Sequence, residues 1–310
     1  MNAAESSWDV IVVGGGSAGL SSALMLVRAR RRVLVLDGGE PRNGVAPRMH
    51  GLLGRDHTSP LDLLADGRRE IEGYGGRCEA GSVLDVEVID GGFVVGTDGG
   101  HRHTARRLLV ATGLRDDLPA ISGVREQWGR GVVVCPYCDG YEVRDRRIAV
   151  IATAPMSAFQ AKLLRQWSTD VTYFSRGEFP PTDLDRAEFE ARGIELEERR
   201  IARVVSSNGV VTAVETVDGD RVSADVVFIA PPSIPRDDVL RRLGAAPTED
   251  GWIQVDGSGR TSVPGLYAVG NVVDLTLNVA MSIGAGAAVG GAINADLVVE
   301  DTAIALADAS

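Results

Sequence analysis

The feature that most constrains the fold is a glycine-rich turn between a short apolar strand and a helix near the N-terminus. Residues 8–13 are mostly apolar, GGGSAG follows at 14–19, and a second apolar strand, RVLVLD, ends at Asp37. A G-x-G-x-x-G turn that opens a helix, followed by an acidic residue at the end of the next strand, is typical of a dinucleotide-binding βαβ unit. The first third of the chain is therefore predicted to bind a dinucleotide.

Each glycine of this turn has a physical task. Gly14 permits the tight turn, Gly16 lets the backbone approach a pyrophosphate, and Gly19 lets the helix pack closely on the strand. The helix begins beside Ser17 and Ala18, where free N–H groups and a partial positive charge suit a phosphate. Asp37 is expected to accept a hydrogen bond from a ribose hydroxyl.

The same order of elements occurs twice. After the first βαβ unit, alternating strands close on a buried strand at Ala111-Thr112-Gly113, and residues 147–232 repeat strand, turn, helix, strand and meander. The chain then returns with a strand that ends at Gly270-Asn271 and a helix rich in small residues. We predict an α/β protein of two Rossmann-like domains, each a three-layer ββα arrangement. The second domain, 117–245, is inserted into the first, which comprises 1–116 and 246–310.

Composition narrows the class of partner. The 310 residues suit two domains, and 43 Asp and Glu against 32 Lys and Arg give a net charge of −11. That charge argues against nucleic acid and against anionic membrane surfaces. The apolar stretch 11–27 is glycine-rich and too short to span a bilayer, and no basic segment precedes it. We expect a cytoplasmic protein with no membrane partner.

A second motif, CPYCDG, carries two cysteines. Cys135 and Cys138 have the spacing of a redox-active disulfide, and Asp139 is adjacent to them, available to donate or accept a proton. The alternative is half of a zinc site, which needs two further ligands. The other candidate ligands share no finger or ribbon spacing with the motif; they are Cys78, His50, His57, His101 and His103.

The redox interpretation is therefore favoured and no metal is expected. Cys78 is expected to be a buried strand residue, and His101 and His103 to lie on the solvated face of a hairpin.

Four motifs in order resemble the low-molecular-weight thioredoxin reductase family of flavoproteins: GGGSAG at 14–19, ATG at 111–113, CPYCDG at 135–140 and GLYAVGN at 265–271. The resemblance covers nearly the whole chain. It implies FAD on the first domain, a pyridine nucleotide on the second in typical members, a dithiol that faces the flavin, and a homodimer. By the same resemblance Cys138 is the flavin-proximal thiol, Cys135 exchanges with substrate, and Asp139 shuttles the thiol proton.

The second nucleotide motif departs from the family pattern. Typical members have G-x-G-x-x-A after the strand, whereas this chain has Ala152, Ala154 and Ser157, with Pro155 among them. Methyl groups then stand where a pyrophosphate would approach, and proline removes one N–H. Only Arg176 remains where the reductases carry a basic cluster for NADPH. The chain is in these respects more similar to a branch of the family, the FAD-dependent dithiol oxidases of the gliotoxin and holomycin type.

Residues 37–56 also resemble that branch, and their polar side chains are expected either near FAD or simply on a surface loop. Asn271 stands where the reductases usually have Asp, and an amide can still bond ribityl hydroxyls. Leu277, Asn278 and Val279 replace an Arg-Gln-Ala sequence at the flavin edge. The full set expected to contact FAD is Gly14, Gly16, Ser17, Ala18, Gly19, Asp37, Glu40, Arg42, Asn43, His50, Ala111, Thr112, Gly113, Gly270, Asn271, Asn278 and Val279.

Three functions agree with these residues. The first is an FAD-dependent dithiol oxidase that forms a disulfide in a small-molecule or peptide dithiol and reduces O2 to H2O2. The second is a thioredoxin-type disulfide reductase fed by NADPH or by a donor such as ferredoxin, with a thioredoxin-like protein as partner. The third is a flavin-bound redox sensor without turnover. The sequence does not identify the dithiol.

Overall fold

The computed structural model describes residues 6–309, which form two compact units. The first unit contains the described residues up to Gly44, then Pro60–Arg115 and the residues from Pro235 onward. The second contains Val45–Ser59 and Asp116–Ile234. The sequence-based boundaries differ in three places: they assign 45–59 to the first domain, they include Asp116 in it, and they begin the return to it at 246 rather than at Pro235.

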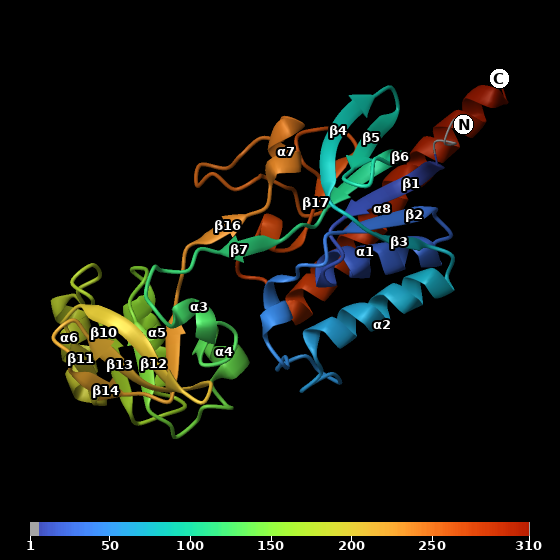
Figure 1. Cartoon of the computed structure of the whole chain (residues 1–310). Helices are drawn as coiled ribbons and strands as arrows, with labels where there is room; N and C mark the ends of the chain where they lie inside the picture. Colours follow the sequence, from blue (N-terminus) through green and yellow to red (C-terminus); the bar gives the residue numbers. More distant parts are fainter. Residues whose placement is uncertain (1–5, 310) are drawn as a thin grey trace. The chain divides into compact units, whose positions relative to one another are not determined.

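A seven-stranded sheet forms the centre of the first unit (Figure 1). The order β3-β2-β1-β6 is parallel, β17 adds to β6 in parallel, and β4, β5 and β6 form an antiparallel meander. The strands are β1 (Ser6–Val13), β2 (Val33–Asp37), β3 (Arg77–Ala80), β4 (Val83–Ile89), β5 (Gly92–Thr97), β6 (Arg102–Val110) and β17 (Leu266–Ala268). Since the central strands are buried on both faces, they read as continuous apolar runs rather than as alternating patterns.

Helices cover one face of this sheet, and the other face packs against α7 and the neighbouring loops. The helical face packs α1 (Ser17–Arg28), α2 (Pro60–Gly73) and α8 (Val279–Asp308) over a core that includes Leu26 and Ile293. The opposite core includes Phe93 and Leu240, the latter from α7 (Asp238–Arg242). Short 3-10 turns, η1 (Arg42–Val45) and η2 (Gly270–Val272), complete the unit. The layers are those of the predicted ββα arrangement.

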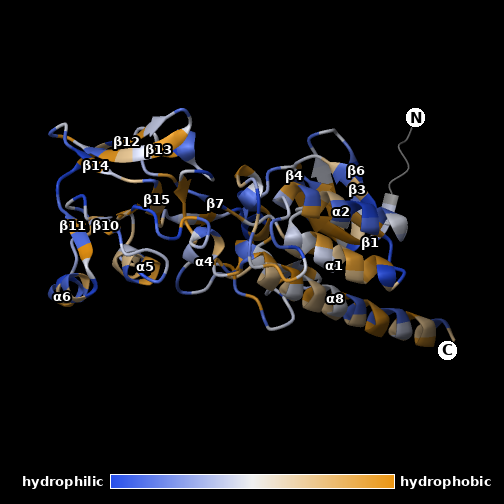
Figure 2. Ribbon diagram, turned by 90° about the horizontal axis from the view of Figure 1, so that it is seen from below, coloured by the Kyte–Doolittle hydropathy of each residue, from blue (hydrophilic) through white to orange (hydrophobic). Residues whose placement is uncertain are grey.

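Helix α8 is unusually long, and by length and composition it is the one described helix that meets the criteria for a membrane span. Its hydropathy is mixed along its length (Figure 2), and its buried face packs against α1. Arg107 of β6 donates to Asp296 and Glu300 of α8 at 2.6 and 2.5 Å. These contacts are those of a core helix in a globular unit.

The second unit repeats the plan at smaller size. Its parallel sheet has the order β11-β10-β9-β15-β8, and a separate antiparallel sheet has the order β12-β13-β14. The strands are β8 (Val132–Val133), β9 (Ile148–Ile151), β10 (Val171–Phe174), β11 (Ile194–Glu197), β12 (Ile201–Ser207), β13 (Val210–Thr216), β14 (Arg221–Ser223) and β15 (Val226–Ile229). The helices are α3 (Val124–Gln127), α4 (Pro136–Asp139), α5 (Ser157–Leu164) and α6 (Asp183–Arg192).

Two passages of the chain between the units run through β7 (Leu114–Asp116) and β16 (Ser233–Pro235), which pair with each other, and two more flank the segment Val45–Ser59. The double passage through β7 and β16 is what an inserted domain requires. The predicted fold class, two Rossmann-like domains with the second inserted into the first, is confirmed.

Candidate functional site

The turn after β1 has the close contacts expected of a phosphate-binding turn. Gly14 has φ +110°, and a Cβ there would lie 2.4 Å from the carbonyl oxygen of Ala111. A Cβ at Gly19 would lie 2.0 Å from the carbonyl oxygen of Gly14. A Cβ at Gly16, in contrast, would meet no atom within 4 Å. Two of these glycines are required by backbone contacts of the protein itself, whereas Gly16 borders open space.

Helix α1 begins at this open side. Gly16 is its N-cap residue and supplies no side-chain cap, so Ser17 and Ala18 lie in a first turn whose N–H groups no capping side chain satisfies. Asp37, at the end of β2, accepts from Arg68 at 2.9 Å and from the N–H of Gly39 at 3.1 Å. Its carboxylate lies against Gly15, where a Cβ would approach within 2.5 Å. The glycine turn thus has a helix end that suits an anion, and the Asp37 carboxylate beside it can accept from hydroxyls.

A second helix end in the same unit is built from the returning chain. Asn278 caps α8, its side-chain oxygen accepting from the N–H of Met281 at 3.0 Å, and Val279 is the first helical residue. Gly270 has φ +83°, and the amide of Asn271 donates to the carbonyl oxygens of Asp274 and Leu277. The Asn271 amide therefore holds the connection between β17 and α8.

The remaining predicted cofactor residues of this unit lie after β6 and after β2, in loops and in a short 3-10 turn. The N–H of Ala111 donates to Val13 at 2.8 Å, and the Thr112 hydroxyl donates to the carbonyl of Arg236 at 2.6 Å. Gly113 has φ +69°, a conformation that favours glycine. Glu40 lies 3.5 Å from Arg236, while Arg42 and Asn43 belong to η1.

In the second unit, Cys135 and Cys138 form a disulfide at the start of α4. Both cysteines are half-buried, and the N–H of Cys138 lies 3.2 Å from the sulfur of Cys135. Gly140 follows the motif because a Cβ there would lie 2.8 Å from the ring of Trp167. Trp167 also contacts the ring of Tyr137 edge-on, at 5.8 Å between centroids.

Asp139, next to Cys138 in the chain, has a carboxyl with a raised pKa. Burial and, to a smaller extent, the charge of Glu142 raise the pKa of its carboxyl to about 6, although His50 acts in the opposite direction. A carboxyl with a pKa near 6 exchanges protons readily close to neutral pH. Glu142 was not identified from the sequence, although it stands only four positions after Cys138.

The structure places His50 in the second unit, within the loop Val45–Ser59. Its Nδ1 lies 3.4 Å from Asp56 and 3.6 Å from Glu142, and its ring contacts the ring of His57 edge-on. Burial acts to raise the pKa of Asp56, but the N–H of Gly51, His57 and His50 together lower it. The expectation that His50 contacts FAD stays a prediction.

The turn after β9, which corresponds to the G-x-G-x-x-A turn of typical family members, is closed by its own side chains. The N–H groups of Thr153 and Ala154 both donate to the hydroxyl of Ser157 at 3.2 Å, and Pro155 has no N–H. Ala152 is fully buried. The sequence revealed the missing glycines, but the capture of two N–H groups by Ser157 depends on the position of a hydroxyl that no pattern indicates.

Two secondary expectations have different outcomes. Cys78 lies half-buried on β3, and burial raises the pKa of its thiol to about 11, which makes it an inert thiol. His101 is exposed, but the solvated position expected for His103 is wrong. His103 is buried on β6, 3.7 Å from Glu79, and burial lowers its pKa although Glu79 opposes this.

Comparison with known proteins extends over nearly the whole chain. A family model described as pyridine nucleotide-disulphide oxidoreductase matches residues 8–291. The thioredoxin reductase tcpT of Claviceps purpurea is 29% identical, with 94% of this chain and 95% of that protein covered. The thioredoxin reductase of Listeria innocua is 28% identical, with 88% of each covered. A solved structure, that of HlmI, is 46% identical with a TM-score of 0.94 and covers 98% of this chain and 96% of its own.

These matches confirm the predicted family and its similarity to the gliotoxin and holomycin type. Enzymes of this family are FAD flavoproteins, and the first unit fits that cofactor. The open side of Gly16 and the α1 N-terminus suit a pyrophosphate, and Asp37 suits a ribose hydroxyl. The chain therefore belongs to the pyridine nucleotide-disulphide oxidoreductase family, as a thioredoxin reductase-like flavoenzyme that uses FAD and acts on thiols and disulfides.

Proposed function

We propose that this enzyme is an FAD-dependent dithiol oxidase, which forms a disulfide in a small-molecule or peptide dithiol and transfers the two electrons to O2, giving H2O2. The observation that carries this proposal is the closed turn after β9. Without a pyridine nucleotide at that turn, we expect the electrons to enter through the cysteine pair.

The closed turn lacks the groups that a pyridine nucleotide needs. A pyrophosphate is bound by free backbone N–H groups at such a turn, but those of Thr153 and Ala154 already donate to Ser157. Arg176, the remaining basic residue at the end of β10, donates to Glu178 at 2.9 Å. A 2′-phosphate placed there would meet a carboxylate as well as the guanidinium, so the arginine is a poor NADPH anchor.

The proposed reaction at the cysteine pair is a thiol–disulfide exchange. A substrate thiolate attacks the sulfur of Cys135, the Cys135–Cys138 bond breaks, and a mixed disulfide forms. The second substrate thiolate attacks the substrate sulfur of that mixed disulfide, which releases the cyclic or linear disulfide product and the Cys135 thiolate. The substrate loses two electrons and two protons, and Asp139 is the carboxylate that accepts a proton at the pair.

FAD, when bound, supplies the two-electron chemistry that reoxidises the pair and reduces O2. The protein's part is to hold Cys135 and Cys138 at the N-terminus of α4, where the packing of Gly140 on Trp167 fixes the motif. The identities support the same proposal: the chain is 46% identical to HlmI and 28% identical to the thioredoxin reductase of Listeria innocua.

The remaining partners are also proposals. We expect a cytoplasmic homodimer whose substrate is a small-molecule or peptide dithiol, with a thioredoxin-like protein as the alternative. Apolar side chains such as Val299 and Ile304 are exposed on α8 and offer surface for a second copy. Size-exclusion chromatography with light scattering tests the dimer directly.

The decisive experiment compares electron donors without oxygen. The purified yellow protein is mixed anaerobically with dithiothreitol or with NADPH, and the flavin absorbance is followed. Bleaching by the dithiol alone is expected, and readmitted air should restore the colour with one H2O2 per dithiol consumed. Rapid bleaching by NADPH would instead indicate the reductase, and no bleaching by either would indicate the sensor.

Two cysteine variants control this experiment. Cys138→Ser should bind FAD yet lose dithiol-driven bleaching, because the disulfide cannot form. Cys78→Ser removes the inert thiol on β3 and should leave the bleaching unchanged. Full bleaching of Cys138→Ser would contradict the role assigned to the pair.

A further inference from the structure

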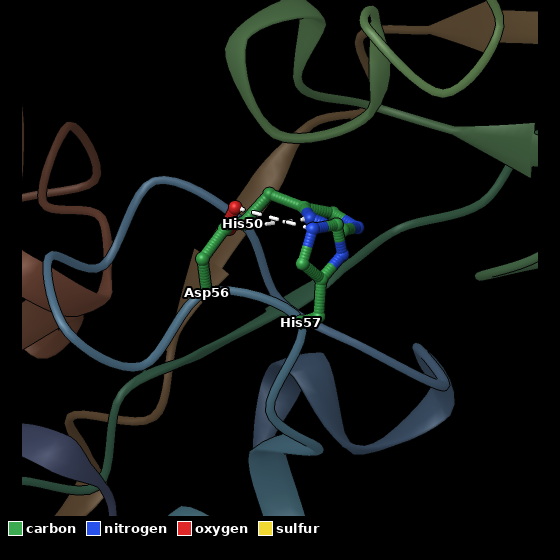
Figure 3. A group of neighbouring side chains, drawn as sticks. All are labelled: His50, Asp56 and His57. Carbon is green, nitrogen blue, oxygen red and sulfur yellow. Dashed lines mark ion pairs between the residues drawn. The ribbon is translucent and has the colours of Figure 1, made fainter.

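The loop between η1 and α2 brings together two histidines and a carboxylate. His50 Nδ1 lies 3.4 Å from one oxygen of Asp56, and His57 Nε2 lies 3.4 Å from the other (Figure 3). One potential ligand atom from each of the three residues can be chosen so that all three lie within 4.8 Å of one another. Among the described residues this is the only group of histidine, cysteine and acidic side chains with such spacing.

The backbone of the loop holds these side chains together. The N–H of Met49 donates to Thr58 at 2.9 Å, and the N–H of His57 donates to Met49 at 3.0 Å. The N–H of Gly51 donates to Asp56 at 3.2 Å. His57 adopts φ +62°, which a residue with a side chain rarely takes without a structural reason. Hydrogen bonds across the neck of the loop thus hold the two histidines beside each other and near Asp56.

The distances between these side chains are longer than those of good hydrogen bonds and leave the three residues within reach of one ion. Good N–H···O bonds have donor–acceptor distances of about 2.7–3.2 Å. Two ligands of a tetrahedral zinc ion, each bonded at about 2.0–2.1 Å, lie roughly 3.3 Å apart. His50 and His57 each lie 3.4 Å from Asp56, close to this separation although they face different oxygens of its carboxylate, and one ligand atom from each of the three residues lies within 4.8 Å of the others.

We propose that His50, Asp56 and His57 form a binding site for one divalent late first-row transition ion such as Zn²⁺. Two imidazoles and one carboxylate are a ligand set that such ions prefer, and the fourth position stays open to water or to an added thiolate. Glu142 lies 3.6 Å from His50 and adds negative charge beside the ligands. No metal site was predicted from the sequence, because His50 and His57 do not have finger or ribbon spacing.

This inference does not depend on the dithiol oxidase proposal, because the three ligands are separate from the cysteine pair. The test uses the FAD-loaded, oxidised protein, freed of metal with EDTA and desalted. Zn²⁺ is titrated in competition with a chromophoric chelator. One site per chain is expected, whereas Mg²⁺ and Ca²⁺, which prefer oxygen ligands, should not compete.

Variants locate the site. His57 is largely exposed, so His57→Ala should fold. It should weaken Zn²⁺ binding by roughly 100-fold, because loss of a direct ligand costs at least as much affinity as loss of an outer-shell partner. Asp56→Asn should also weaken it. His101→Ala removes an exposed histidine that belongs to the other unit and should have no effect. A Cys135→Ser/Cys138→Ser double variant should retain the site.

Two results would overturn the proposal. One is Zn²⁺ binding by His57→Ala and Asp56→Asn with the affinity of the unaltered protein. The other is loss of binding in the double cysteine variant, which would assign the metal to the thiols instead.

Discussion

At the scale of single residues, we propose that the reactivity of the disulfide depends on the protonation of one carboxyl, that of Asp139. Its surroundings oppose the charged form, since it is removed from water and faces Glu142, and only His50 favours ionisation. Because this pKa is about 6, the carboxyl changes between its protonated and ionised forms close to the pH at which the enzyme would work. Below that value the carboxyl is protonated and cannot accept a thiol proton; above it the carboxylate is available.

Replacement of Asp139 therefore has a pH-dependent effect. For Asp139→Asn we expect the rate of dithiol-driven flavin bleaching to fall by about 100-fold at pH 8, as for loss of a general base. The ratio of the unaltered rate to the variant rate should rise through pH 6 and then level off. Stopped-flow absorbance across pH 5–9 measures this ratio. A ratio independent of pH would show that Asp139 is not the base.

Glu142→Gln provides the matched control for the electrostatic cause. The charge of Glu142 raises the pKa of Asp139, so its removal should shift the inflection to lower pH while the plateau rate changes little. An inflection that moves to higher pH would contradict the assigned sign.

At the scale of elements, the flavin-binding unit depends on how closely α8 approaches α1. A Cβ at Gly286 would lie 2.2 Å from the carbonyl oxygen of Ala18, and the Ser22 hydroxyl donates to the carbonyl of Gly286 at 2.7 Å. Ser21 donates to the carbonyl of Ile283 at 2.7 Å as well. Small residues on α8 thus let two helix backbones touch beside the α1 N-terminus.

Gly286→Ala should destabilise the protein by roughly 1–3 kcal/mol, because overpacking must separate the helices. Flavin should also be lost more readily on dialysis. Gly291→Ala, in the same helix, meets nothing within 4 Å and should be neutral or stabilising by about 0.5–1 kcal/mol. Thermal denaturation and flavin retention of the two variants measure the difference. Equal stabilities would show that the contact of α8 with α1 tolerates a methyl group.

The closed turn after β9 should keep NADPH out even when its glycines are restored. Restoring Ala152→Gly and Ala154→Gly removes two methyl groups, but Ser157 still accepts both N–H groups and Pro155 still lacks one. NADPH oxidation by this double variant should remain at the level of the unaltered protein, measured by absorbance of the nicotinamide. Robust NADPH oxidation would show that the methyl groups alone closed the site.

At the scale of the whole molecule, flavin and folding are coupled by mass action. A ligand at 100 times its Kd stabilises the folded state by about 2.7 kcal/mol. Added FAD should therefore raise the melting temperature of the flavin-depleted protein by several degrees, as followed by calorimetry. NADPH at the same concentration should leave it unchanged. A rise with NADPH equal to that with FAD would contradict the closed second turn.

Much of this architecture could be predicted from the sequence, because glycines at fixed spacing and runs of buried strand residues leave few alternatives. Gly14 and Gly19 have the backbone contacts that the motif indicates. The place of the loop 45–59 in the second unit could not be predicted, since the loop has little regular structure and its hydrogen bonds join Met49 to Thr58 and His57. The proximity of Glu142 and His50 to Asp139 also depends on that loop, and no local pattern encodes it.

The absence of a side chain at Gly140 leaves the indole of Trp167 directly against the cysteine helix. Disulfides quench indole emission by accepting an excited electron, whereas thiols quench it less. The chain thus contains its own fluorescent reporter: we expect the emission of Trp167 to brighten when the Cys135–Cys138 bond opens, and replacement of this tryptophan by phenylalanine to abolish that signal.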